Sequence, residues 1–263
     1  MKNHIIDLKG GDDAVLLIHG LTGSPFELKN LARHLNRAGY TVKGPCLAGH
    51  GTTIDDLSKT RWQDWYGTVR EEFDEMKKNH RNVFSGGLCM GALFSLYLAY
   101  EVKDDMSAIA MLSTTLSYDG WSLPWYKFLL PVSYYPPLKY FYSYEEREPY
   151  GIKDERMRKH IASALHDNLI AYSKFPSKAM HELFKHISAV KKIMPEVKTP
   201  TLLLHALEDD IASTKNADYV EKNIGSSDVR KIFLDNSYHM LTLDFQKDEV
   251  AAQTIRFFNE HAG

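Results

Sequence analysis

The chain has 263 residues, of which 44% are hydrophobic and 25% charged, and a formal net charge of −2. This length and balance allow one large buried core and exclude wholesale disorder. The charge supplies no basic field for a nucleic acid, so we expect no nucleic-acid partner. No apolar run has the length and flanks of a secretory signal or a membrane span, and we therefore expect a cytoplasmic protein without a transmembrane segment.

The first half of the chain alternates short aliphatic stretches with helical patterns. Residues 14–19 (AVLLIH) are aliphatic and bounded by glycine, which predicts a buried strand. Ser24, Pro25 and Glu27 have the order of an N-cap, a first helical residue and a capping box, and predict a helix that ends at Gly39. Further strands are expected at 40–45, 82–87 and 107–113, and further helices from 62 to about 80 and at 92–102.

This alternation stops at residue 114 and resumes late in the chain. Strands are expected at 199–206 and 229–234, and helices at about 215–222 and 247–260. Repeated strand–helix units predict an α/β protein with a mostly parallel sheet that helices cover on both faces. The segment 114–195 supplies no strand to this sheet, yet it is too apolar for a linker. We interpret it as a helical cap inserted into a core formed by 1–113 and 196–263.

Residues 87–91 (GLCMG) have the spacing of a nucleophile elbow, G-x-nucleophile-x-G, between an expected strand and an expected helix. The nucleophile of such an elbow lies on a strained turn, so the residues two positions away must be small, as Gly87 and Gly91 are. The pattern alone is weak, because a cysteine at a helix start also packs as a small hydrophobic residue. Cys89 is therefore a candidate nucleophile whose assignment depends on its partners.

A nucleophile of this type needs a histidine base and an acid that orients the base, in the chain order nucleophile, acid, histidine. One late strand is followed by Glu208, Asp209 and Asp210, and the next strand is followed by His239. Carboxyl ends of successive parallel strands are where such groups meet. The order predicts a triad of Cys89, His239 and one of the three acids.

These motifs resemble those of α/β-hydrolases of the carboxylesterase and monoacylglycerol lipase branch. In that branch a buried strand like PTLLLH is followed by the triad aspartate and, eight positions later, by an alanine that opens a helix. The matching residues here are Asp209 and Ala217, with Asp210 as the alternative acid. The resemblance covers nearly the whole chain outside the cap and implies the α/β-hydrolase fold.

Two early loops share this resemblance. The stretch HGLTGSP follows the first long strand, and the resemblance implies that the backbone N–H groups of Leu21 and Met90 form an oxyanion hole. The stretch GPCLAGHGTT resembles the GHG loop of these esterases. It implies that His50 is a structural loop residue and not a second base.

Cys89 departs from the resemblance, because this branch normally carries serine there. A thiol at a helix N-terminus beside a histidine can ionise near neutral pH and act as the nucleophile itself. Polyhydroxyalkanoate synthases and dienelactone hydrolases are similar folds with a cysteine in the elbow, and the synthases transfer acyl groups. Three alternatives stay open beside a cysteine hydrolase: an acyltransferase, a serine esterase with a Ser→Cys substitution, and a non-catalytic binding relative. With Cys46 as the one other cysteine, we expect no disulfide.

The cap segment indicates an apolar substrate. Its first part is rich in aromatic residues and proline, and we expect Trp121, Trp125 and Phe128 to contact the substrate. Such a cap favours a small-molecule ester or thioester with an apolar acyl chain, and its aromatic residues favour weak contact with a lipid interface. No metal-ligand spacing and no phosphate-binding loop is present in the sequence, so we expect no metal and no cofactor. The predicted function is hydrolysis of that ester through an acyl-Cys89 intermediate.

Overall fold

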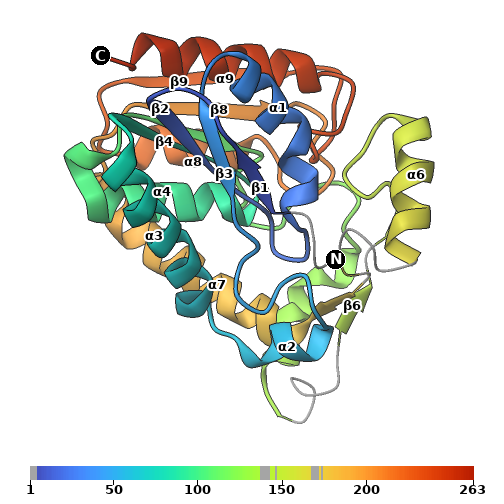
Figure 1. Ribbon diagram of the computed structural model, residues 1–263. Helices are drawn as coiled ribbons and strands as arrows, with labels where there is room; N and C mark the ends of the chain where they lie inside the picture. Colours follow the sequence, from blue (N-terminus) through green and yellow to red (C-terminus); the bar gives the residue numbers. More distant parts are fainter. Residues whose placement is uncertain (1–4, 137–142, 146, 167–171, 173) are drawn as a thin grey trace.

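The fold is built around one mixed sheet. The computed structural model describes residues 5–136, 143–145, 147–166, 172 and 174–263. Within these residues the sheet has seven strands, in the order β1 (Ile6–Leu8), β3 (Thr41–Gly44), β2 (Asp13–Ile18), β4 (Asn82–Leu88), β5 (Ile109–Leu112), β8 (Thr201–Ala206) and β9 (Val229–Leu234). Neighbouring strands are parallel except β1, which pairs with β3 in the antiparallel sense (Figure 1). The carboxyl ends of the parallel strands therefore point to one side of the molecule.

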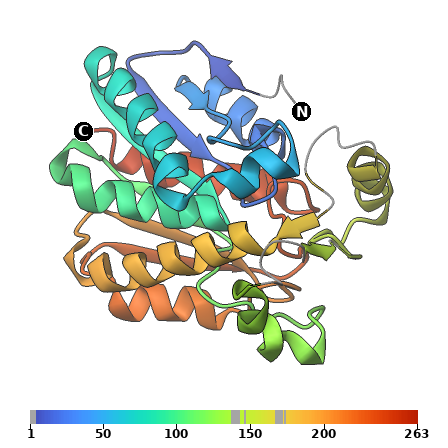
Figure 2. The same ribbon diagram turned by 90° about the horizontal axis from the view of Figure 1, so that it is seen from below.

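Helices cover both faces of the sheet (Figures 1 and 2). One face carries α1 (Lys29–Arg37) and α9 (Lys247–Glu260). The other carries α3 (Trp62–Asn79), α4 (Met90–Val102), α7 (Ser177–Ile193) and α8 (Lys215–Asn223). Shorter pieces of helix lie in the connections: α2 (Ile54–Lys59) and the 3₁₀ helices η1 (Pro25–Leu28), η2 (Lys103–Asp105) and η4 (Met194–Glu196).

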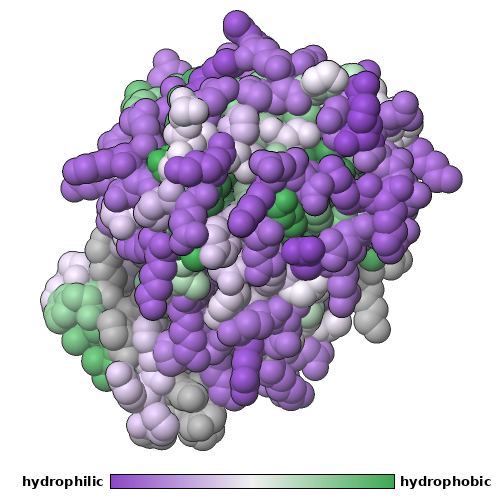
Figure 3. Space-filling view, turned by 90° about the vertical axis from the view of Figure 1, so that its left-hand side faces the viewer, coloured by the Kyte–Doolittle hydropathy of each residue, from purple (hydrophilic) through white to green (hydrophobic). Residues whose placement is uncertain are grey.

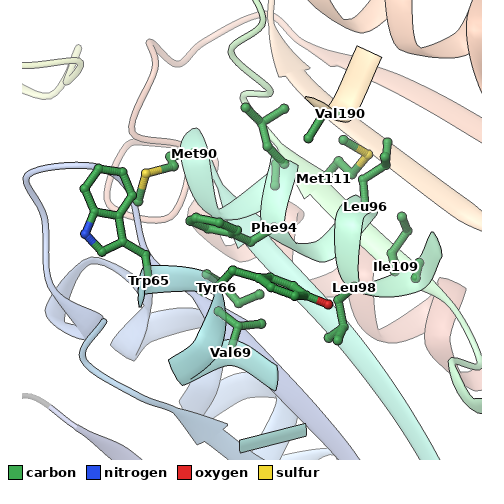
Figure 4. Packing of buried hydrophobic residues seen from close by; sticks show 14 of the residues in the cluster. Trp65, Tyr66, Val69, Met90, Phe94, Leu96, Leu98, Ile109, Met111 and Val190 are labelled. Atoms are coloured by element: carbon green, nitrogen blue, oxygen red, sulfur yellow. The ribbon is translucent and has the colours of Figure 1, made fainter. Parts of the chain in front are cut away.

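Strand β2 explains why the central strands are continuous apolar runs. Leu17 packs in the cluster formed with α1 and α9, and Ile18 packs in the cluster formed with α3 and α4. Figure 4 shows the second cluster, in which Trp65 of α3 and Phe94 of α4 are fully buried. Burial of a side chain such as Phe94 stabilises the fold by about 1.5–3 kcal/mol. A strand covered on both sides therefore needs apolar residues at every position.

The chain between β5 and α7 forms the cap over the carboxyl ends of the strands. It contains η3 (Trp125–Tyr134), β6 (Ser143–Glu145), α6 (Glu155–His166) and β7 (Lys174–Pro176), and β6 pairs with β7 in the antiparallel sense. Helix α7 packs against α4 and is part of the helix layer on the sheet. The boundaries of the core and the cap at residues 114 and 195 remain a prediction.

The α/β architecture agrees with the sequence pattern, but three details differ from what the pattern predicts: β1, α2 and the start of α1. The strand β1 and the helix α2 were not predicted, because three and six residues are too few to display a period. The capping box at residues 24–27 is wrong: the Ser24 side chain makes no capping hydrogen bond, and η1 precedes α1. The Glu27 carboxylate instead accepts the backbone N–H of Gly20.

Candidate active site

Cys89 occupies the turn between β4 and α4. Its backbone has φ of 56° and ψ of −113°, a conformation that residues other than glycine rarely adopt. The flanking glycines make this turn sterically feasible. A Cβ atom on Gly87 would lie 2.1 Å from the carbonyl carbon of Gly91, and one on Gly91 would lie 1.9 Å from the carbonyl oxygen of Ile18. The strained turn presents the thiol at the N-terminus of α4, as a nucleophile elbow requires.

His239 and Asp209 meet beside this turn. His239 lies in the loop after β9 and Asp209 in the loop after β8, so both come from the carboxyl end of the sheet. The Nδ1–H of His239 donates to the Asp209 carboxylate, with distances of 2.9 Å to Oδ2 and 3.0 Å to Oδ1. Asp209 Oδ1 also accepts the backbone N–H groups of Ile211 and Ala212, at 2.9 and 2.8 Å. These bonds fix the carboxylate, which in turn fixes the orientation of the imidazole.

Charges around the imidazole favour its protonated form. Burial alone would lower the pKa of His239, but the Asp209 carboxylate and negative charge on Cys89 raise this pKa well above its usual value. Burial raises the pKa of Asp209, but the positive charge of His239 and its hydrogen bond outweigh this effect, so that the pKa is lowered. His239 Nε2 is buried and makes no hydrogen bond to any residue that the structure describes. This nitrogen is the one that can exchange a proton with the thiol.

The other two acids have different positions. Asp210 accepts the backbone N–H of His239 at 3.3 Å with one oxygen and the backbone N–H of Gly151 at 3.2 Å with the other. Burial raises the pKa of Asp210, whereas the pKa of Asp209 is lowered. Glu208 pairs with Lys153 at 2.6 Å on the surface. Of the three acids, Asp209 is therefore the one that contacts the imidazole.

A further buried carboxylate, that of Asp244, connects the cap to the histidine loop. It accepts the backbone N–H groups of Lys153 and Asp154 at 2.7 and 2.9 Å, and that of Tyr238 at 2.8 Å. Tyr238 immediately precedes His239. Asp244 and Asp210 thus attach the middle of the cap to the loop that carries His239, and together they accept five backbone hydrogen bonds from these two segments.

Two buried histidines support the loop after β2. His19 Nδ1 donates to the carbonyl oxygen of Gly20 at 2.8 Å, and His50 Nε2 donates to that of Leu21. Burial, together with the charge of His50, lowers the pKa of His19 to about 3, and burial lowers that of His50 to about 4, so both rings are neutral. His50 thus serves as a support for the Leu21 backbone, the structural role that the sequence resemblance implied.

Of the two proposed oxyanion donors, Leu21 lies in the loop after β2 and Met90 is the first residue of α4. Met90 begins α4, where a backbone N–H has no partner within the helix. The N–H of Leu21 donates to no other residue in the described part of the chain, and Leu21 borders the same cavity as Cys89. Their role in binding an oxyanion remains a prediction.

Glu27 is a residue of the site that the sequence pattern misassigned. Its side chain is buried between the loop after β2 and the cavity that Cys89 and His239 also line. Burial raises the pKa of Glu27 to about 7, and the hydrogen bond from Gly20 and the charge of His239 only partly offset this effect. A Cβ atom on Gly23 would lie 2.0 Å from Glu27 Oε2. In the sequence, only the glycines of HGLTGSP indicate that another group, here the Glu27 side chain, packs closely against this loop.

A cavity of about 520 Å³ opens at Cys89 and His239. Its other walls are largely apolar side chains from the core and the cap, among them Leu129, Val132, Ile161, Met180 and Leu243. A few polar groups, including Glu27 and Tyr118, face the same space. The size and the lining suit an acyl chain with a polar reacting end.

The expected contact of Trp121, Trp125 and Phe128 with the substrate remains a prediction. These side chains are 60%, 82% and 66% exposed and do not line the cavity. The period of η3 explains why Trp125 and Phe128 lie outside the cavity, because a 3₁₀ helix repeats every three residues and places 125 and 128 on one side and 129 and 132 on another. Trp121 instead donates its Nε1–H to the carbonyl oxygen of Glu208 at 3.0 Å.

Three further observations describe the site and its surroundings. Cys46 and Cys89 are both free thiols. Over the residues that the structure describes, no group of three or more His, Cys, Asp or Glu side chains is placed to hold a metal ion. In the same residues, no helix combines the length and the apolar character needed to cross a bilayer.

Comparison with known proteins places the chain in a family. Residues 11–246 match the Hydrolase_4 family, described as serine aminopeptidase, S33, and the chain belongs to this family. A thermostable monoacylglycerol lipase from Bacillus sp. (strain H-257) is 29% identical over 97% of this chain and 94% of its own. A carboxylesterase from Bacillus subtilis (strain 168) is 27% identical over 96% and 94%.

Solved structures share the fold of this chain. A structure described under LipS and LipT, two metagenome-derived lipolytic enzymes, has a TM-score of 0.83 and 25% identity, and covers 98% of this chain and 97% of its own. The monoacylglycerol lipase of Paleococcus ferrophilus has a TM-score of 0.80 at 17% identity and covers 98% of each chain. The α/β-hydrolase fold predicted from the sequence is confirmed. The protein is a lipase- or esterase-type ester hydrolase of the α/β-hydrolase superfamily.

Proposed function

We propose that this protein hydrolyses carboxylic esters or thioesters with an apolar acyl chain through an acyl-Cys89 intermediate. The observation that carries the proposal is that Cys89 and His239 line one largely apolar cavity, while Asp209 holds the imidazole of His239 by a hydrogen bond. The relatives named monoacylglycerol lipase and carboxylesterase support an ester as the substrate. The strained backbone at Cys89 supports its assignment as the nucleophile.

The first half of the reaction forms the acyl-enzyme. His239 Nε2 takes the thiol proton, and the sulfur of Cys89 attacks the carbonyl carbon, so that a C–S bond forms and the carbonyl π electrons move to oxygen. The N–H groups of Leu21 and Met90 stabilise this oxyanion, and a donor of this kind contributes about 3 kcal/mol. The oxyanion then collapses, the bond to the leaving group breaks, and the leaving group takes the proton from His239.

The second half of the reaction releases the acid. A water molecule gives its proton to His239 and attacks the acyl carbon, and the C–S bond breaks when the second oxyanion collapses. The sulfur leaves as thiolate and recovers the proton from His239. Asp209 keeps the Nδ1–H tautomer of the imidazole throughout, because its carboxylate only accepts hydrogen bonds.

Acyl transfer to an alcohol, amine or thiol is the second candidate function. It is favoured by the identity of the nucleophile, because an acyl-cysteine is a thioester, which reacts readily with nucleophiles other than water. An acyltransferase predicts slow hydrolysis that accelerates when an acceptor is added. Product analysis with and without added glycerol or butanol separates this function from hydrolysis.

The test compares the wild type with its Cys89→Ser and Cys89→Ala variants on p-nitrophenyl esters from acetate to laurate, with Cys46→Ala as a matched control. We expect turnover by the wild type and by Cys46→Ala, no turnover by Cys89→Ala, and an acyl adduct on Cys89 in mass spectra. A much faster Cys89→Ser variant would show a serine esterase with a substituted nucleophile. If the protein showed neither turnover nor an acyl adduct, the proposed reaction would be wrong, and the protein would be a non-catalytic relative that only binds its ligand.

The exposed surface of η3 supports weak contact with a lipid interface. Trp125, Phe128 and Val132 are more than half exposed, and aromatic side chains favour the boundary between water and lipid. Figure 3 shows one face of the molecule, largely hydrophilic, with a hydrophobic group at its lower left edge. Binding to phosphatidylcholine vesicles that weakens in a Trp125→Ala/Phe128→Ala double variant would support this contact, and equal binding of both proteins would contradict it.

A further inference from the structure

The Cys89 thiol contacts a hydroxyl that the triad does not include. Cys89 Sγ donates to Thr115 Oγ1 at 3.3 Å, and Thr115 Oγ1 lies 3.1 Å from the carbonyl oxygen of Ser113, to which it donates. A hydroxyl has a single hydrogen, and this one is directed to Ser113. The Thr115 oxygen therefore accepts the hydrogen of the Cys89 thiol. His239 Nε2, in contrast, has no hydrogen-bond partner among the described residues.

The segment that carries Thr115 is rigidly placed. It directly follows β5, and its first residue, Ser113, has φ of 43°. Ser113 Oγ donates to the carbonyl oxygen of His239 at 2.6 Å, and Ser113 N–H donates to that of Leu204 at 2.9 Å. Thr115 is also buried, so its hydroxyl has only two partners within reach in the described structure, the Ser113 carbonyl and the Cys89 sulfur.

We propose that Thr115 is a positioning residue for Cys89, whose hydroxyl accepts the S–H of the thiol and, after proton transfer to His239, turns from the Ser113 carbonyl to donate to the thiolate. The S–H bond breaks and an N–H bond forms at Nε2, while the Thr115 O–H bond only rotates, so no other proton moves. This inference rests on the proposed function, which makes Cys89 the nucleophile.

The proposed hydrogen bond from Thr115 stabilises the thiolate form of Cys89. A hydroxyl that donates to a buried thiolate stabilises the charged form and lowers the pKa of the thiol. Two titratable groups interact electrostatically with Cys89, His239 from the loop after β9 and Tyr118 from the loop after β5. The same cavity is also lined by Glu27 from η1 and by Tyr144, Glu145, Arg147 and Tyr150 of the cap. A variant that leaves all these groups in place isolates the contribution of Thr115.

The experiment measures the rate of alkylation of Cys89 by iodoacetamide between pH 5 and pH 10, in a Cys46→Ala background. Thr115→Val replaces the hydroxyl with a methyl group of similar shape, and we expect it to raise the pH midpoint by about one unit and to slow alkylation at neutral pH about tenfold. Thr115→Ser keeps the hydroxyl and should restore the wild-type midpoint. Thr114→Val is the matched control, because it removes the neighbouring buried hydroxyl, which makes no hydrogen bond to the sulfur.

The outcomes separate this inference from the proposed function. An unchanged midpoint in Thr115→Val, or an equal shift in Thr114→Val, would overturn the role of Thr115 even if Cys89 forms an acyl adduct. Failure of Cys89 to acylate would overturn the proposed function, whatever the alkylation midpoints are. If Thr115→Val does not fold, as judged by its thermal transition, Thr115→Ala and Thr115→Ser provide the same comparison of a missing and a retained hydroxyl.

Discussion

The carboxylate of Asp210 joins His239 to Gly151 by accepting the backbone N–H of each. Its neighbour in the sequence, Asp209, contacts the imidazole ring instead. Two adjacent aspartates thus divide two tasks: one orients the ring and the other holds the backbone of the loop. Because the two tasks differ in charge and geometry, they are separable by matched substitutions.

Asp209→Asn and Asp210→Asn should have different effects. Asp209→Asn removes the charge that raises the pKa of His239 and offers an N–H where an acceptor is needed, so we expect kcat/KM to fall by about 10³–10⁴. Asp210→Asn loses one backbone hydrogen bond and should lower the free energy of unfolding by about 1–3 kcal/mol with a smaller loss of activity. Ester hydrolysis and urea unfolding of both variants check this, and an inverted order of the activities would contradict the assignment.

Gly91→Ala should prevent the elbow from forming. The added Cβ would lie 1.9 Å from the carbonyl oxygen of Ile18, so the strand and the helix would have to separate. We expect destabilisation of more than about 4 kcal/mol or loss of soluble protein. Gly67→Ala in α3 is the control, because a Cβ there meets nothing within 4 Å and should stabilise the helix by about 0.5–1 kcal/mol. Thermal unfolding of both variants gives the comparison, and a Gly91→Ala protein as stable as the wild type would refute the packing argument.

Glu27→Gln should flatten the pH dependence of stability. The pKa of Glu27 rises from 4.5 to about 7 on folding, so its contribution is fully present below pH 4.5 and is lost as the pH rises through about 7. The difference corresponds to roughly 3 kcal/mol at about 1.4 kcal/mol per pH unit. Urea unfolding at pH 5 and pH 8 should show this loss in the wild type and in Glu71→Gln, an exposed control on α3, but not in Glu27→Gln.

His186→Phe should make the protein more resistant to acid. Both ring nitrogens of His186 are buried without hydrogen-bond partners among the described residues, and the ring stacks on Phe94 with 4.2 Å between centroids. Burial lowers the pKa of His186 from 6.5 to about 3, so stability is complete above pH 6.5 and falls as the pH drops toward 3. At pH 5 the unfolded state gains roughly 2 kcal/mol from this protonation. Denaturation at pH 5 and pH 8 should show a larger gain for the variant at pH 5, and equal gains would contradict the titration.

Much of the sheet, and the contact between His239 and Asp209, was predictable from local patterns and strand order. Strand β2 is a continuous apolar run, and the elbow glycines surround Cys89 at a fixed spacing. Asp209 and His239 follow successive strands, so a parallel sheet alone places them close together. Such features can be predicted from neighbouring residues in the sequence and from the order of the strands.

The remaining features depend on contacts between distant segments. Glu27 has the position of a capping residue in the sequence, and only the approach of Gly20 gives its carboxylate another partner. Trp125 and Leu129 are both apolar, and the orientation of η3 decides which one faces the cavity. Thr115 has no motif, because its role depends on its 3.3 Å contact with the sulfur of Cys89.

Asp210 and Asp244 anchor the middle of the cap, at residues 151–154, to the loop that carries His239. The anchors separate the cap segment that lines the cavity from the loop that carries the proposed base. The chain from η3 to β6 precedes these anchors, whereas His239 lies beyond them. Substitutions within η3 and β6 can therefore reshape the cavity without displacing the histidine. The architecture allows a lineage of such proteins to exchange one substrate for another while the reaction chemistry stays the same.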